Sequence, residues 1–382
     1  MAINAAASRR VVRAPRRPDR LPELDILRGI AVLAVLFLHS YFRMWPEVTE
    51  GERMALRVSH LFAHGAVPVF LFISGFLLAR DRSPSFGAFV RRRLQRIAVP
   101  AVVWMTLALA YEAWRADGLS SALLRRFVLF DIEGQFYFIF VLGVLMAAAY
   151  PLRHTSTRVL TRVTAGSFLL GLGVVAWYER QPITGDLAVF AYRNPAIWAF
   201  FFVFGLFAYR LRGGVPSWGR DLEVLAGLGM VVTFGAYFWQ GETRGYPTSY
   251  FGVTVFVFSS LGLVVYPALV RLALQTNIGR LVAWPFAWIA PLSFGIFLVH
   301  QPYFLGWLSS NAVMGTRFEA SWSQLMVANF VVGAVGSLGF VCAVDMLWPR
   351  LASLVLGVDR PSQPGDIEGD AERAARAAVR VA

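Results

Sequence analysis

The sequence predicts an all-α, polytopic membrane protein: a bundle of about ten transmembrane helices with both termini in the cytoplasm. Hydrophobic residues make up 57% of the chain and charged residues only 15%, whereas a soluble domain usually carries roughly a quarter charged residues. The apolar residues fall into runs of about twenty, the length that the hydrocarbon core of a bilayer requires. Arginines lie between these runs. We therefore expect lipid to be the main solvent of the fold.

The expected spans follow one another at short intervals. They lie near residues 26–45, 58–79, 97–114, 134–151, 163–179, 194–209, 221–239, 250–270, 288–308 and 324–348. We divide the chain into a basic cytoplasmic tail (1–22), a transmembrane domain (23–350) and a second cytoplasmic tail (351–382). The second tail is rich in Ala, Arg and Glu, so we expect it to be disordered or weakly helical.

The basic residues orient the chain in the membrane. All 36 are arginines, and with a cytoplasmic amino terminus the inward segments hold 25 of them and the outward loops 10. Because arginine is enriched on the cytoplasmic side of membrane proteins, both ends are expected to lie there. The net charge of +13 could suggest a nucleic-acid partner, but these arginines alternate with apolar runs instead of forming one basic surface. Membrane lipids, and no nucleic acid, are the expected partners.

Ionisable residues inside apolar spans are the first functional candidates, because they are costly in lipid unless they face protein or water. They are Arg28, His39, His64, His300 and Asp345. Arg28 and His39 are eleven residues apart, which on a helix corresponds to about 20° of rotation and about 16 Å of rise. We expect both to line one wall at two depths, with Arg28 at the cytoplasmic end.

A second cluster of arginines precedes the third span. Arg93 and Arg96 are one helical turn apart, and guanidinium groups pair with phosphate oxygens in bidentate geometry. Together with Arg28, they favour a phosphorylated donor over a neutral sugar. Membrane anchoring alone is the alternative, and it applies mainly to the neighbouring Arg91 and Arg92.

Four stretches, in this order, resemble motifs of the acyltransferase-3 family of membrane O-acyltransferases. They are Leu24–Ala31 followed by His39, Val67–Leu77, the paired-arginine motif Arg93–Ile97 with Pro100, and Leu292–His300. The resemblance extends from Leu24 to Pro349. Phe294 and Phe297 replace the usual tyrosines of the last motif, and Gln135–Phe138 replaces a His-Leu-Trp-Phe-like stretch, so acceptor details stay open.

The resemblance implies transfer of an acyl group, commonly acetyl from acetyl-CoA, to a hydroxyl of an extracytoplasmic or lipid-linked carbohydrate. It implies a multi-pass protein of the bacterial inner membrane with no permanently bound cofactor. The implied roles are donor binding for Arg28, Arg93, Arg96 and Ser74, catalysis for His39, acceptor contact or proton relay for His64 and His300, and structural support for Asp25, Gly29, Gly75 and Asp345.

Several alternatives remain open at this stage. Direct transfer and an acyl-histidine intermediate fit His39 equally, and His300 could simply bridge two helices. Ser74 could serve helix packing. His60 and His64 lack a third ligand, so no metal is expected. Succinyl instead of acetyl would need an extra cation, for which Arg43, Arg125 and Arg126 are candidates.

Two other classes of function compete with the enzyme. A transporter or flippase of a glycan or lipid would use Arg28 and His39 as substrate or proton sites. The chain shows no repeat at a fixed period and no matching pair of interrupted spans, which disfavours this class. A non-catalytic scaffold would tolerate loss of both residues. The oligomeric state and the identity of the acceptor are not predicted.

Overall fold

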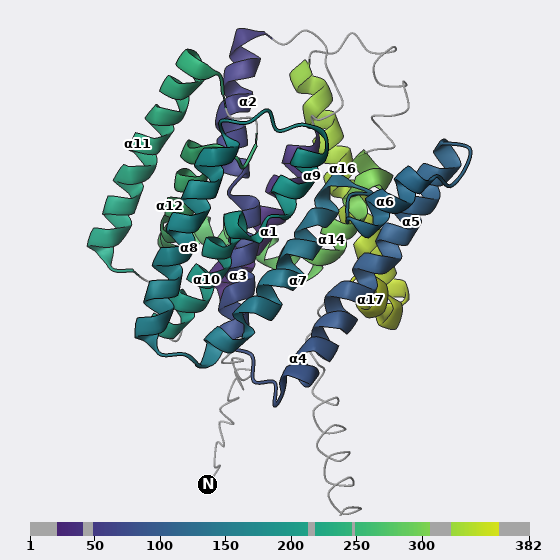
Figure 1. The fold of residues 1–382 in the computed structure, drawn as a ribbon, viewed down its shortest axis with the longest axis horizontal. Coiled ribbons are helices and arrows are strands. Elements are labelled where there is room, and N and C mark those ends of the chain that lie inside the picture. The colour runs from purple at the N-terminus through teal and green to yellow at the C-terminus, as the bar shows by residue number, and fades with distance from the viewer. Residues whose placement is uncertain (1–20, 41–48, 213–217, 247–248, 306–321, 359–382) are drawn as a thin grey trace, which may run out of the picture.

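The computed structural model describes residues 21–40, 49–212, 218–246, 249–305 and 322–358. Within these ranges every regular element is a helix (Figure 1). Nine helical stretches of the described chain are long and apolar enough to cross a membrane: Glu50–Ala79, Phe86–Arg115, Gly134–His154, Thr157–Tyr178, Gly185–Leu211, Arg220–Arg244, Val253–Leu274, Asn277–Val299 and Ser323–Leu347. The predicted class, an all-α polytopic bundle, is confirmed. The sidedness of the termini stays a prediction.

The bounds of the helices set the frame for the site. They are α1 (Pro22–Ser40), α2 (Glu50–Ala63), α3 (Ala66–Ala79), α4 (Phe86–Arg93), η1 (Leu94–Ala98), α5 (Val99–Arg115), α6 (Ser121–Val128), η2 (Gly134–Phe136), α7 (Tyr137–Ala149), η3 (Tyr150–His154), α8 (Thr157–Tyr178), α9 (Gly185–Arg193), α10 (Pro195–Arg212), α11 (Arg220–Arg244), α12 (Val253–Leu274), α13 (Asn277–Ile289), η4 (Ala290–Leu292), α14 (Ser293–Val299), η5 (His300–Phe304), α16 (Trp322–Leu347) and α17 (Pro349–Val355).

Helix α1 is not one of these nine stretches, but it is close to them in length. Its 19 residues rise about 28 Å, close to the thickness of a bilayer core. It carries Glu23, Asp25 and Arg28 near its start. Its Val32 and Leu36 are fully buried, and it packs on α3, α13 and α16. Much of this helix is packed against protein, which makes a charged residue on it tolerable.

Two glycines allow neighbouring helices to touch. A Cβ atom on Gly75 of α3 would lie 1.8 Å from the carbonyl oxygen of Phe202 on α10, and one on Gly29 of α1 would lie 2.0 Å from that of Phe286 on α13. Only hydrogen fits at these distances, and small residues at helix interfaces are a common device of membrane bundles. The two contacts fix α1 and α3, which carry most of the predicted site.

The outer helices present apolar side chains outward. Helix α11 lies at one edge of the bundle (Figure 1), and its Leu225, Val231 and Val232 are each more than 60% exposed. Water would not stabilise such a surface, whereas lipid does. The distribution of exposed apolar residues therefore agrees with a membrane-embedded bundle.

The ninth span begins earlier than predicted. The sequence suggested 288–308, but the helical stretch runs from Asn277 to Val299 through α13, η4 and α14. The Thr276 hydroxyl caps the start by accepting from the Gly279 N–H at 2.9 Å. Pro285, inside α13, is a residue that usually ends a helix. His300 consequently follows the end of the span instead of lying in its outer half.

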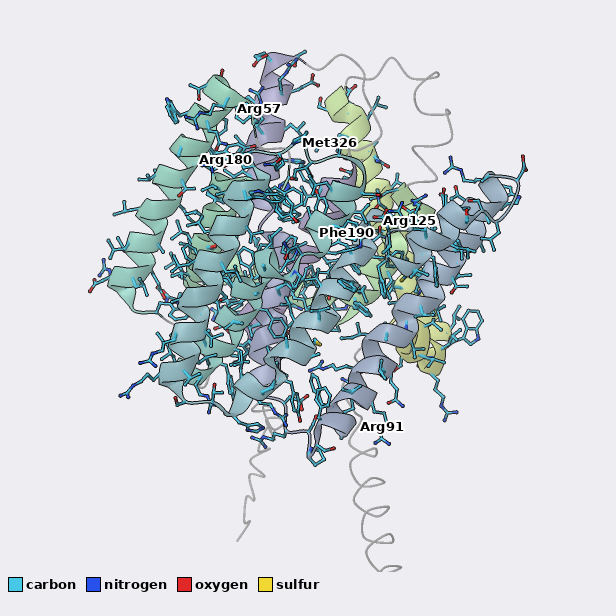
Figure 2. The ribbon with its side chains drawn as sticks, in the orientation of Figure 1. Arg57, Arg91, Arg125, Arg180, Phe190 and Met326 are labelled. Carbon is cyan, nitrogen blue, oxygen red and sulfur yellow. The ribbon has the colours of Figure 1, made fainter. Side chains whose placement is uncertain are left out.

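The bundle has two polar ends. Arg57 of α2 and Arg180 after α8 lie near one end, and Arg91 of α4 lies at the opposite end (Figure 2). We call these ends the α2 face and the α4 face. Charged residues gather at the two ends because lipid headgroups and water meet the protein there.

Candidate functional site

A first cavity, of about 150 Å³, brings the predicted donor residues together. Arg28, Ser74, Arg93 and Arg96 all line it, as does Ser293 of α14. We call it the arginine cavity. Arg96 is exposed, so the cavity reaches the surface near α4. Three guanidinium groups around one small space form a binding site suited to phosphate oxygens.

A π-helix separates the two arginines of the paired motif. Arg93 ends α4 and Arg96 lies within η1, where the Val99 N–H donates to the Leu94 carbonyl, five residues back. Such turns are rare and occur frequently at functional sites. The extra residue in the turn rotates η1 relative to α4, and both side chains line the same cavity. The sequence suggested only a regular helical turn here.

Asp81, which was not among the residues predicted from the sequence, forms ion pairs with several arginines of this region. Its carboxylate lies 3.6 Å from the Arg93 guanidinium, 3.3 Å from that of Arg92 and 3.7 Å from that of Arg153. Burial raises the pKa of Asp81, but hydrogen bonds from Ser83 and the charges of Arg92 and Arg93 outweigh it, so the net pKa is lowered. Asp81 therefore stays ionised and holds Arg93 beside the arginine cavity.

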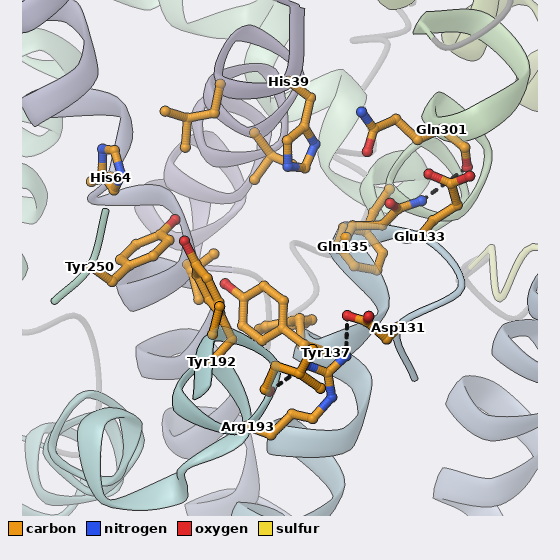
Figure 3. A pocket seen from close by; sticks show the side chains of 18 of the residues that line it. His39, His64, Asp131, Glu133, Gln135, Tyr137, Tyr192, Arg193, Tyr250 and Gln301 are labelled. Carbon is orange, nitrogen blue, oxygen red and sulfur yellow. Dashed lines mark hydrogen bonds and ion pairs between the residues drawn. The ribbon is translucent and has the colours of Figure 1, made fainter. Parts of the chain in front are cut away.

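A second cavity, of about 410 Å³, surrounds the predicted catalytic histidine. His39 and His64 both line it, together with His60, Tyr192 and Tyr250 (Figure 3). We call it the histidine cavity. The His64 ring lies 4.6 Å from the Tyr250 ring, and its Nδ1 donates to the His60 carbonyl at 2.6 Å. His64 is thus fixed in the cavity wall.

His39 and His300 are hydrogen-bonded to each other. The His39 Nδ1 and the His300 Nε2 are 2.7 Å apart, and the two rings are nearly parallel, with 6° between their planes. The His300 Nδ1 lies 2.7 Å from the Phe297 carbonyl. Because a carbonyl only accepts, the neutral His300 carries its proton on Nδ1 and accepts at Nε2.

This chain of contacts fixes the tautomer of His39. Since the His300 Nε2 accepts, the His39 Nδ1 must donate, which leaves the His39 Nε2 unprotonated. An unprotonated imidazole nitrogen at a cavity wall is able to take a proton from a hydroxyl group. The hydrogen bond between His39 and His300 is compatible with both roles considered for His300, a proton relay and a bridge between two helices.

Another part of the histidine cavity wall is polar and was not predicted from the sequence. The Arg193 guanidinium lies 2.9 Å from the Asp131 carboxylate, and both residues line the cavity. Gln135 donates from its Nε2 to the Gln301 carbonyl at 2.9 Å. Within the described part of the chain, the buried Gln135 Oε1 has no hydrogen-bond partner. A buried amide oxygen at a cavity wall is a ready acceptor for a ligand hydroxyl.

Aromatic rings complete this wall. Tyr137, Tyr192 and Tyr250 lie side by side in Figure 3, with 5.1 Å between the first two ring centroids and 6.4 Å between the last two. The only sequence signal was the unusual Gln135–Phe138 stretch. Arg193 lies between the predicted spans 163–179 and 194–209, in a segment expected to be an outward loop.

The remaining predicted residues lie away from both cavities. Asp25 is half-buried in the first turn of α1, one turn before Arg28, and Asp345 is half-buried near the end of α16, close to Cys342. Neither lines a cavity wall. Among the described residues, no group of three or more His, Cys, Asp or Glu side chains is placed to hold a metal ion.

Arg28 and His39, expected to line one wall at two depths, border two different cavities. Arg28 lines the arginine cavity and His39 the histidine cavity, and the two cavities share Phe70, Phe138 and Phe297 as wall residues. The cavities therefore abut, with hydrocarbon rings between them. The two α1 residues face adjoining spaces on the same side of the helix.

A protein-family model described as an acyltransferase domain matches residues 21–346. No curated protein and no solved structure matches the chain.

Proposed function

The chain belongs to the acyltransferase-3 family and is a membrane acyltransferase, and from this we propose that it moves an acetyl group from cytoplasmic acetyl-CoA to a carbohydrate hydroxyl. The acceptor is an extracytoplasmic or lipid-linked glycan, and the membrane is the bacterial inner membrane. The observation that carries this proposal is the His39–His300 hydrogen bond, which leaves the His39 Nε2 free to act as a base.

The donor is proposed to bind at the arginine cavity. Arg28, Arg93 and Arg96 would hold its phosphates by charge-assisted hydrogen bonds. A volume of about 150 Å³ is below that of a typical pocket for a whole drug-sized ligand. The nucleotide would therefore stay near the exposed Arg96 while the narrow pantetheine arm extends inward toward His39.

The acceptor is proposed to lie in the histidine cavity. Sugars bind through hydroxyl hydrogen bonds and through the contact of their C–H faces with aromatic rings. Gln135 offers a buried amide oxygen and Tyr137, Tyr192 and Tyr250 offer rings on the same wall. The Arg193–Asp131 pair is internally neutralised, so this wall suits a neutral, hydroxyl-rich group.

The proposed reaction is direct transfer. The acceptor oxygen attacks the thioester carbonyl carbon while the His39 Nε2 takes the hydroxyl proton, and His300 accepts from the resulting imidazolium through the bond already formed. The carbon–sulfur bond then breaks. His39 returns its proton to the thiolate, so the products are an ester and the free thiol of CoA.

The test is acyl transfer by purified protein in detergent, with acetyl-labelled acetyl-CoA and a glycan or glycolipid extract as acceptor. We expect labelled ester and released CoA, and we expect His39→Ala to lower kcat by about 10²-fold or more, the usual contribution of a general base. His154→Ala is the matched control, because His154 is exposed on η3 and outside both cavities.

Two results would contradict the proposal. Near-normal transfer by folded His39→Ala protein would remove His39 from the mechanism. Absence of product in detergent, combined with glycan or lipid movement in sealed vesicles, would favour the transporter alternative.

A further inference from the structure

The three phenylalanines between the cavities form a continuous partition. Phe70 comes from α3, Phe138 from α7 and Phe297 from α14. The Phe138 ring lies 6.1 Å from that of Phe70 and 5.5 Å from that of Phe297, in tilted and edge-to-face arrangements typical of packed aromatic side chains. We call these three side chains the phenylalanine septum.

The polar groups of the proposed reaction lie on opposite sides of the septum. On one side are Arg28 and Ser293, and on the other side are His39 and Gln135. The Ser293 hydroxyl is buried and, within the described residues, has no hydrogen-bond partner. It is placed to bind an amide or carbonyl group of an arm that extends from the arginine cavity. An acyl group that moves directly from the arginine cavity into the histidine cavity meets these three rings.

Resting on the proposed function, we infer that the phenylalanine septum selects the donor: it admits a short, uncharged acyl group such as acetyl and rejects an acyl group that carries a carboxylate, such as succinyl. A carboxylate between hydrocarbon rings loses its hydration and gains no partner, which is among the costliest forms of burial. A small apolar acyl group loses little there.

The cations proposed for a succinyl group do not change this expectation. Arg125 forms an ion pair at 2.7 Å with Asp186, and both side chains are exposed. Arg126 lines the histidine cavity and donates to the carbonyls of Asp131 and Ile132. Arg126 could thus meet a carboxylate only after that group has crossed the septum. Arg43 lies outside the described residues.

Passage of an acyl group through the phenylalanine septum requires rotation of a phenylalanine ring more than movement of a helix. Gly75 holds α3 against α10 through direct backbone contact, and Phe70 lies five residues, about one and a half turns, away from it on the same helix. Phe70 is half-buried, whereas Phe138 and Phe297 are buried. The less confined ring is therefore the one best able to move aside, and its size sets the width of the opening.

The first experiment compares donors. Transfer of labelled acetyl, butyryl and succinyl groups from the corresponding CoA thioesters is measured for wild type, Phe138→Ala and Phe70→Ala. We expect wild type to favour acetyl over succinyl by about 50-fold or more, and each variant to reduce that ratio by about tenfold, because the carboxylate keeps water in the opened space. Phe140→Ala is the matched control: it lies on the same helix, α7, and lines neither cavity. Size-exclusion profiles establish that each variant is folded.

The second experiment tests the partition without catalysis. Ser293→Cys is introduced together with Cys342→Ser, which removes the natural cysteine. A small, cationic, membrane-impermeant methanethiosulfonate reagent is added to vesicles of each orientation. With the septum intact, labelling is expected only when the α4 face is exposed to the reagent. With Phe138→Ala added, labelling from the α2 face is expected to rise by about tenfold, since a missing ring leaves a cavity where the partition was.

The two experiments test different parts of the proposal: the first tests the selectivity for the donor, and the second tests the separation of the two cavities. Equal transfer of acetyl and succinyl by wild type, or a ratio that the septum variants leave unchanged, would overturn the selectivity. Equally fast labelling from both faces in the protein with an intact septum would overturn the barrier. If no donor yields product while Ser293→Cys is still labelled only from the α4 face, the proposed function is wrong but the phenylalanine septum does separate the two cavities.

Discussion

Proton positions in the site depend on His300 as much as on His39. The Phe297 carbonyl fixes the proton of His300 on Nδ1, and this in turn leaves the His39 Nε2 unprotonated. Such indirect control is common where a second group orients a catalytic imidazole. We therefore expect His300 to act as a positioning residue, whose loss should affect the reaction step more than substrate binding.

Replacing His300 provides a test at this scale. His300→Leu should lower kcat by about 10- to 100-fold with little change in KM, because His39 loses the acceptor that sets its tautomer. His300→Gln should recover part of the rate, since the glutamine carbonyl oxygen is able to accept from the His39 Nδ1. The measurement is steady-state transfer over a range of pH. Equal loss in both variants, with an unshifted pH profile, would indicate a purely structural role.

Asp81 joins several elements at the α4 face. It lies between α3 and α4, and it contacts Arg92 and Arg93 of α4 and Arg153 of η3. Arg153 and Asp81 are mostly buried, with side chains 7% and 12% exposed. A buried carboxylate that meets three guanidinium groups stabilises the fold and also holds Arg93 at the arginine cavity.

The pH dependence of stability follows from the lowered pKa of Asp81. A carboxylate whose pKa is lower in the folded than in the unfolded state stabilises the fold above its ordinary pKa of about 3.9, and this contribution is lost as the pH falls through the folded pKa. Asp81→Asn should thus reduce the free energy of unfolding by about 1–2 kcal/mol at pH 7. The difference from wild type should stay constant down to about pH 5 and shrink below about pH 4.

Thermal unfolding in detergent at pH 7, 5 and 3 is the measurement. Asp117→Asn is the control, because Asp117 is exposed in the loop after α5. A difference between wild type and Asp81→Asn that grows as the pH falls would contradict this account of the network.

The long helices were predictable because each is an apolar run of bilayer length, as in Thr157–Tyr178 or Val253–Leu274. The short helices α4, α6 and α9, at the ends of spans, were not predicted. Eight or nine residues give a weak periodic signal. The ninth span was misplaced because Arg280 and Pro285 resemble loop residues, although Thr276 caps a helix there.

The site was predictable where a motif supplied it and hidden where only the fold assembles it. Arg28 and His39 could be identified from charge inside an apolar span. Arg193 and Asp131 are 62 residues apart, and no spacing rule brings such residues together. The bond between His39 and His300 has the same origin, since 261 residues separate them.

At the scale of the whole molecule, the two cavities lie one beyond the other between the two faces. The arginine cavity reaches the surface near α4, and the histidine cavity lies beyond the phenylalanine septum. This order matches the arginine distribution, in which the segment containing α4 is predicted to be cytoplasmic. A cytoplasmic donor and an extracytoplasmic acceptor would then approach from opposite sides.

Membrane orientation is therefore a decisive measurement. A fluorescent protein fused after Ala382 should be fluorescent, and alkaline phosphatase fused at the same place should be inactive, because both report a cytoplasmic carboxyl terminus. The reverse result would place the arginine cavity on the side that lacks CoA, and the proposed direction of transfer would be wrong.

Phe297 contributes its ring to the septum and its backbone carbonyl to His300. Rotation of the ring leaves the carbonyl where it is, whereas displacement of the α14 backbone would break its hydrogen bond with the His300 Nδ1, and the tautomers of His300 and His39 would no longer be fixed. In the proposed mechanism, a donor that passes by rotation of the ring would meet a His39 whose Nε2 is already unprotonated, whereas a donor that displaces α14 would not. The proposed selection of the donor would therefore act through the packing of the three rings and also through the proton positions on the two histidines.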